Sequence, residues 1–130
     1  MSQANVALIQ TLLDVFLATG EMSWELLDED IEVHDHDVMD AGEYRGHLGF
    51  ARWLENWDAA WSEFTIEPEE FLDAEPCVVL VFRMKATGRS SGAAVERHDA
   101  MVWQVRDGKA VRLDYFNDRE QALKSVKLST

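Results

Sequence analysis

The sequence predicts an α+β domain in which three N-terminal helices lie on one face of a curved, mostly antiparallel sheet. Apolar residues recur at helical spacing through the first half of the chain, and from about residue 62 onward the pattern changes to β-prone runs separated by turn residues. Helices followed by antiparallel strands are typical of this fold class. No repeat, low-complexity stretch or linker divides the 130 residues, so we expect a single domain over 1–130.

Three helices are expected before the main group of strands. The first covers 3–19, where apolar residues follow helical spacing from Val6 to Phe16 and Gly20 provides a stop. The second is a short helix over 23–30 with Ser23 as its N-cap. The third spans roughly 47–61. Its expected apolar face comprises Phe50, Trp53, Leu54, Trp57 and Trp61.

Strands are expected between the second and third helices and throughout the second half of the chain. Ile31 and Val33 alternate with polar neighbours over 31–36, and 40–46 is predicted to be a turn-rich connection. Residues 62–74 are extended, with a break at Pro68. Further strands are expected at 77–88, 94–105 and 111–117, with connections at 88–92 and at an Asp-Gly turn, and a terminal helix at 119–126 capped by Asp118.

The acidic composition disfavours some partners. The chain has 12 basic and 25 acidic residues and a formal net charge of −13, whereas nucleic acid and anionic membranes require basic patches, so neither is expected as a partner. No apolar run approaches the roughly 20 residues of a membrane span, and the N-terminal segment lacks the basic start of a secretory signal. Cys77 is the one cysteine and can form no disulfide within the chain, which indicates a cytoplasmic location.

Three stretches together resemble the SnoaL-like group of the nuclear transport factor two-like superfamily. They are AGEYRGHLGFARWLENW, GRSSGAAVE and VWQVRDGKAVRLDYFNDREQAL. The resemblance implies a cone-shaped barrel with a pocket between the helices and the bent sheet, and a homodimer formed through the outer sheet face. The apolar residues on both faces of 78–84 and 101–105 also favour a homodimer. The fold hosts ketosteroid isomerases, polyketide cyclases, limonene epoxide hydrolases, dehydratases and binding modules, so it does not decide the function.

The stretch EVHDHD concentrates titratable side chains at the end of the first expected strand. Alternation places Ile31, Val33 and Asp35 on the core side, and His34 and His36 on the opposite side. Two histidines at this spacing would need a third protein ligand to hold a metal ion. We therefore expect no metal site, and a place for the histidines at a rim or an interface.

Asp35 is the sharpest candidate for chemistry. The resemblance implies that it occupies the general-base position of the ketosteroid isomerases. A carboxylate at the mouth of an apolar pocket has a destabilised charged form, so we expect Asp35 to have a raised pKa and to act as an acid or base. The alternative is a solvated strand end or a turn former. The positions that match the isomerases' tyrosine and second acid hold Leu13 and Met101, which cannot stabilise an oxyanion by hydrogen bonding, and this departure disfavours steroid isomerase chemistry.

Arg97 and Asp99 are further catalytic candidates, because they share a strand face with Met101. The resemblance to limonene epoxide hydrolases, which hold a water with an Asp-Arg-Asp set, implies a polar group at this place. The alternative is an ion pair at a strand end. By comparison with the polyketide cyclases, Asp35, Asp99 and Asp114 are acidic candidates, although Asp114 is expected to face outward.

The pocket is expected to be lined mainly by aromatic and sulfur-containing side chains, the alternative being plain core packing. These are Trp53, Trp57, Phe82, Met84, Met101, Trp103 and Tyr115, with the Tyr44 hydroxyl near the mouth. Two functions stay open. One is a cofactor-independent isomerase, cyclase or hydrolase that acts on a small hydrophobic substrate with Asp35 as acid or base. The other is a non-catalytic module that binds a small apolar molecule or a partner protein. No cofactor is expected in either case.

Overall fold

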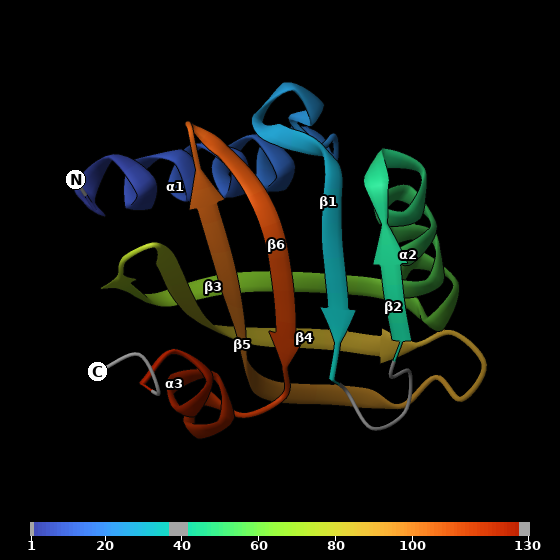
Figure 1. Ribbon diagram of the computed structural model, residues 1–130. Helices are drawn as coiled ribbons and strands as arrows, with labels where there is room; N and C mark the ends of the chain where they lie inside the picture. Colours follow the sequence, from blue (N-terminus) through green and yellow to red (C-terminus); the bar gives the residue numbers. More distant parts are fainter. Residues whose placement is uncertain (1, 37–41, 128–130) are drawn as a thin grey trace.

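The computed structural model describes residues 2–36 and 42–127, and it confirms the predicted α+β class (Figure 1). The helices are α1 (Ser2–Thr19), α2 (Gly46–Ala60) and α3 (Arg119–Lys127), with one 3₁₀ turn, η1 (Trp24–Leu26). The strands are β1 (Leu27–Asp35), β2 (Gly42–Arg45), β3 (Trp61–Ala74), β4 (Cys77–Gly88), β5 (Ala94–Arg106) and β6 (Lys109–Phe116).

The strands form one six-stranded sheet in the order β2-β1-β6-β5-β4-β3. The β1–β6 pair is parallel and the other pairs are antiparallel, so the sheet is mixed but mostly antiparallel. Figure 1 shows β3 and β4 running across the direction of β1 and β6, which is the strong bend expected of a cone. The bend creates a concave face, and α1 and α2 pack against it.

Two hydrophobic cores lie on the two faces of the sheet. The larger core joins Ile9 and Leu12 of α1 and Phe50 of α2 to inward side chains of the strands. The smaller core joins Ala122 of α3 to outward side chains of the strands, among them Val79. Helix α3 therefore covers part of the outer face, which accounts for the apolar residues on both faces of β4 and β5 within one chain. The homodimer stays a prediction.

The prediction of a second helix over 23–30 is wrong beyond the first turn of that segment. Only Trp24–Leu26 forms a 3₁₀ turn, Ser23 makes no side-chain cap, and the strand begins at Leu27. Leu27 is 1% exposed and pairs with Ala110 of β6, so a pairing across the sheet replaces the local helical preference. Trp61, expected on the third helix, instead begins β3.

The connection expected at 40–46 is partly a strand. Residues 42–45 form β2, an edge strand that pairs with β1 from Glu32 to Asp35. Residues 40 and 41 lie outside the described part of the chain. The pairing of β2 with β1 places α2, which follows directly, against the same end of the sheet.

A bulge in β6 decides which side chains enter the concave face. Val105 pairs with Ala110, but Gln104 pairs with Arg112, so Val111 is the extra residue. The insertion reverses the faces of the residues that follow, because side chains alternate along a strand. Leu113 and Tyr115 consequently face the larger core.

Candidate functional site

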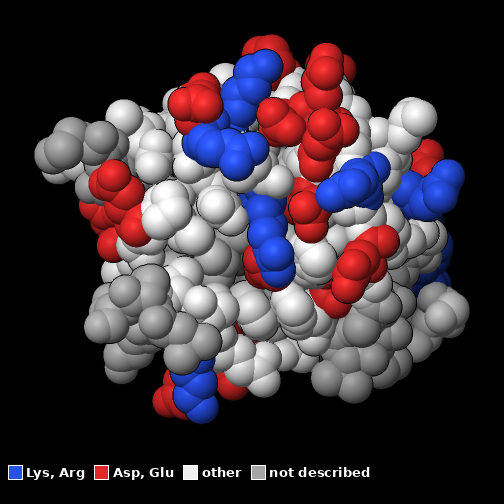
Figure 2. Space-filling view, viewed as in Figure 1, with Lys and Arg blue, Asp and Glu red and all other residues white. Residues whose placement is uncertain are grey.

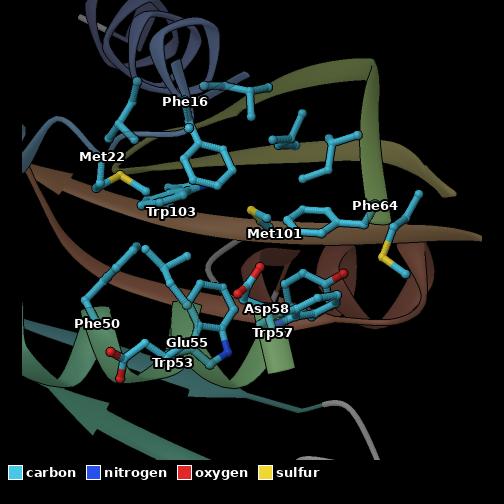
Figure 3. Close-up of a pocket in the computed structure, with 18 of the residues that line it drawn as sticks. Phe16, Met22, Phe50, Trp53, Glu55, Trp57, Asp58, Phe64, Met101 and Trp103 are labelled. Atoms are coloured by element: carbon cyan, nitrogen blue, oxygen red, sulfur yellow. The ribbon is translucent and has the colours of Figure 1, made fainter. Parts of the chain in front are cut away.

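A cavity of about 560 Å³ lies between α1, α2 and the concave face of the sheet. Figure 3 shows Phe16 and Met22 on one side, Phe50, Trp53 and Trp57 of α2 on the other, and Met101 and Trp103 of β5 between them. Its volume lies in the range of pockets that hold drug-sized molecules, and mostly apolar walls are typical of such pockets. Seven of the lining side chains are aromatic: Phe16, Phe50, Trp53, Trp57, Phe64, Trp103 and Tyr115.

Most of the side chains expected to line the pocket do line this cavity. They are Trp53, Trp57, Met84, Met101, Trp103 and Tyr115. Phe82 and Tyr44 are not among its lining residues. Phe82 is fully buried behind the wall, with its ring centroid 6.0 Å from that of Tyr115, and the Tyr44 hydroxyl accepts a 2.9 Å hydrogen bond from Asn56 Nδ2.

Asp35 is buried beside the cavity rather than in its lining. It ends β1, is 4% exposed, and accepts a hydrogen bond of 2.8 Å at Oδ2 from the indole Nε1 of Trp53. The inward direction predicted from alternation is confirmed, because Ile31 and Val33 are also buried. The carboxylate lies at the nitrogen-bearing edge of the Trp53 indole, and Trp53 forms part of the cavity wall.

Arg97, Asp99 and Tyr115 form a second buried polar group on the concave face. Asp99 Oδ2 accepts a hydrogen bond from the Tyr115 hydroxyl and another, of 2.9 Å, from Arg97 Nη2. Asp99 is fully buried, whereas the side chain of Arg97 is 26% exposed. Neither Arg97 nor Asp99 lines the cavity, but Tyr115 does.

The hydroxyl of Tyr115 is a fixed proton donor. Burial, and then the negative charge and hydrogen bond of Asp99, raise the pKa of Tyr115 far above its usual range, while Arg97 opposes this effect. The phenol therefore stays protonated, and its donated hydrogen bond points at Asp99. Like Trp53, Tyr115 gives an aromatic ring to the cavity wall and its polar hydrogen to a buried carboxylate.

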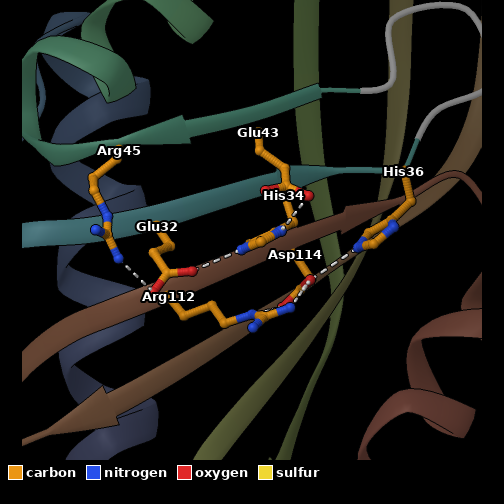
Figure 4. Close-up of polar contacts among 7 residues, drawn as sticks. All are labelled: Glu32, His34, His36, Glu43, Arg45, Arg112 and Asp114. Carbon is orange, nitrogen blue, oxygen red and sulfur yellow. Dashed lines mark hydrogen bonds and ion pairs between the residues drawn. The ribbon is translucent and has the colours of Figure 1, made fainter.

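The two histidines of EVHDHD lie on the outer face, in an ionic cluster (Figure 4). His34 Nε2 is 3.0 Å from Glu32 Oε1, and His36 Nε2 is 2.9 Å from Asp114 Oδ1. Arg112 Nε also bonds Asp114, at 2.8 Å, which confirms that Asp114 faces outward. Figure 2, viewed from this side, shows acidic and basic side chains interleaved.

Three titratable groups of this cluster have clearly shifted pKa values: those of Glu32 and Asp114 are lowered and that of Arg112 is raised. Burial raises the pKa of Asp114, but the hydrogen bonds from Arg112 and His36 outweigh it and leave the pKa below its usual range. Within residues 2–36 and 42–127, no group of three or more His, Cys, Asp and Glu side chains is arranged to hold a metal ion. No helix in these residues has both the length and the apolar character to cross a bilayer.

The charged residues of the cavity lining were not predicted from the sequence. Glu55, Asp58 and Arg89 belong to its lining and are exposed, so they mark where it opens to solvent. Glu55 and Asp58 lie on α2 beside Trp53 and Trp57, and helical spacing could have placed them next to the aromatic face. Arg89 comes from the connection between β4 and β5, and no local pattern links it to α2.

The chain belongs to the SnoaL-like domain family, whose profile matches residues 18–113. Among solved structures it is similar to TerC, co-crystallised with polyporic acid (20% identity over 95% of this chain and 98% of that one, TM-score 0.76). It is also similar to Bal32a from a soil-derived mobile gene cassette (15% identity, coverage 96% and 97%, TM-score 0.79).

A third similar structure is a candidate SnoaL-like polyketide cyclase from Jannaschia sp. CCS1 (16% identity, coverage 96% and 92%, TM-score 0.76). No curated protein sequence matches the chain. At these identities the structural likeness establishes the fold, which is that of the nuclear transport factor two-like proteins related to polyketide cyclases and ketosteroid isomerases.

Proposed function

We propose that this protein binds a small hydrophobic molecule in the cavity between α1, α2 and the sheet. The observation that carries the proposal is the cavity of about 560 Å³ with seven aromatic side chains in its wall. Burial of an apolar molecule against such walls is favourable by roughly 25 cal/mol for each Å² removed from water. A rigid, planar molecule with several rings suits walls made of Phe, Trp and Tyr, because offset and edge-to-face contacts add to apolar burial.

The co-crystal of TerC with polyporic acid supports ligand binding by a protein of this fold. It concerns a protein of the same fold at 20% identity. For this chain the proposal depends on its own lining residues.

Proton transfer by Asp35 is a second candidate function, as in a cofactor-independent isomerase, cyclase or hydrolase. The observation in its favour is that a 4% exposed carboxylate bonds an indole of the cavity wall. Buried carboxyl groups next to apolar pockets are the groups that serve as acids and bases near neutral pH. The reaction would require a substrate atom to reach Asp35 past the edge of Trp53.

Calorimetric titration with a neutral aromatic probe, naphthylmethanol, tests the binding proposal. We expect saturable binding with one site per chain. Met101→Trp adds bulk to the cavity wall and should weaken binding by at least about tenfold, a loss of about 1.4 kcal/mol. Leu123→Trp introduces the same side chain on α3, outside the cavity, and should leave the affinity unchanged. Absence of binding, or equal loss in both variants, would refute the proposal.

The two functions are separated by Asp35→Asn. If the protein is a binding module, this variant keeps its ligand affinity and there is no turnover to lose. In an enzyme it keeps the affinity but loses turnover of any substrate that the wild-type protein converts.

A further inference from the structure

We propose that the natural ligand carries a positively charged group, such as an amine or a quaternary ammonium, which Glu55 and Asp58 attract at the cavity mouth while its apolar body lies against the aromatic walls. This inference rests on the proposed function, because it names the class of ligand for the same cavity. Four observations support it.

The first observation is the state of the two carboxylates. Glu55 and Asp58 are three residues apart on α2, so they share one face of the helix, and both belong to the cavity lining. Figure 3 shows both on the α2 side, together with Trp53 and Trp57. Within residues 2–36 and 42–127, neither carboxylate forms an ion pair or a side-chain hydrogen bond.

The second observation concerns Arg89, the one basic residue in the described lining. Its guanidinium does not bond either carboxylate. Arg89 Nε and Nη2 donate to the backbone oxygen of Asp58 at 3.2 and 2.9 Å, and Nη2 also donates to that of Trp61 at 3.0 Å. These oxygens lie at the C-terminal end of α2, where the helix dipole is negative. The Arg89 charge thus offsets the helix end, and the carboxylates remain available to a ligand.

The third observation is the aromatic wall behind the mouth. The face of an aromatic ring carries negative electrostatic potential, so a cation within about 6 Å of the ring centre is attracted, and most strongly by Trp. Three tryptophans and Tyr115 belong to the lining. The Tyr115 hydroxyl already donates its hydrogen bond to Asp99, so it is not available to donate to an anionic ligand.

The fourth observation is the net charge of −13. At low ionic strength this charge raises the local concentration of cations and lowers that of anions around the whole molecule. Long-range attraction alone selects no site, so the test must separate it from the effect of Glu55 and Asp58.

The test compares three probes that share one ring system: naphthylmethylammonium, naphthylmethanol and naphthoate. We expect the cation to bind about tenfold more tightly than the alcohol at low salt, the alcohol to bind more tightly than the anion, and the differences to shrink as salt rises. In the double variant Glu55→Gln/Asp58→Asn, the ratio of the cation's affinity to the alcohol's affinity should fall to within about twofold.

The control is Glu75→Gln/Asp107→Asn, which removes the same two charges from exposed turns outside the cavity lining and should retain the preference. Equal losses in both double variants would overturn the assignment to Glu55 and Asp58. Binding of the alcohol as tightly as the cation would overturn the inference while leaving the proposed function in place. Failure of all three probes to bind would refute the proposed function, and the inference with it.

Discussion

Replacing Tyr115 by Phe is the cleanest test of the buried polar group on β5 and β6. The substitution removes one oxygen and leaves the ring, so it opens no sizeable cavity. Tyr115 is 2% exposed and Asp99 is fully buried, so water cannot readily replace the lost donor. A hydrogen bond to a buried charged group contributes about 1.5–3 kcal/mol. Arg97 still donates to Asp99, so we expect a loss of about 2 kcal/mol, near the lower end of that range.

The assay is urea unfolding of the wild type, Tyr115→Phe and Tyr44→Phe, with the free energy of unfolding taken from the linear region. The chain has two tyrosines, and Tyr44 serves as the control because its hydroxyl is at the surface and accepts a bond from Asn56. We expect Tyr44→Phe to change stability by less than about 0.5 kcal/mol. A loss below about 0.5 kcal/mol for Tyr115→Phe as well would refute the assigned strength of the Tyr115–Asp99 bond.

The pH dependence of the same variants gives an independent check. The raised pKa of Tyr115 means that its contribution is fully present below the pKa of an unfolded tyrosine and is lost as pH rises through the higher folded-state value. Wild type should therefore lose stability above about pH 10, and Tyr115→Phe should lose less. In Tyr44→Phe, tyrosinate absorbance should appear together with unfolding; its appearance in the folded protein would contradict the assignment.

Three further predictions concern the outer face. The lowered pKa of Asp114 gives stability that is present above the pKa of an unfolded aspartate and is lost as pH falls through the lower folded-state value. Arg112→Met should therefore cost about 1 kcal/mol near neutral pH, and acid unfolding should show that this difference disappears once Asp114 is protonated in the folded protein. Burial and then the charge of Asp114 raise the pKa of Cys77, so a thiol reagent should modify it at least about tenfold more slowly in the folded than in the unfolded chain. If the predicted homodimer forms, light scattering at micromolar concentration should give twice the chain mass of 14.8 kDa; a monomer mass would contradict it.

The parts of the fold that follow from local patterns could be predicted from the sequence. The period-2 alternation of Ile31, Val33 and Asp35 depends only on neighbouring residues, and all three are buried as expected. The tryptophan-rich stripe of α2 is also a local pattern. The bounds of helix α2 differ from the expected 47–61 by one residue at each end. Most side chains expected in the cavity wall come from these two kinds of pattern and from the alternation along β4 and β5.

The remaining features depend on contacts between distant segments. The sequence around Leu27 is compatible with a helix or a strand, and the pairing of Leu27 with Ala110 of β6 makes it part of a strand. The bulge at Val111 turns Tyr115 inward beside Met101, which places its hydroxyl within reach of Asp99 two residues earlier on β5. No residue type marks a bulge of this kind, so the Tyr115–Asp99 pair could not be derived from the sequence. Arg89 likewise meets the end of α2 only through the folded hairpin.

The bond between Trp53 and Asp35 decides whether the candidate acid or base is coupled to the cavity wall. Trp53→Phe removes the indole donor, and Asp35→Leu removes the acceptor while keeping a similar volume. Each single change also alters packing, so the informative quantity is the difference between the double variant and the sum of the singles. For a bond of 2.8 Å between side chains that are both 4% exposed, we expect a coupling energy of about 1.5–3 kcal/mol. Additive effects would mean that Asp35 is held by other contacts and is not coupled to the cavity wall through Trp53.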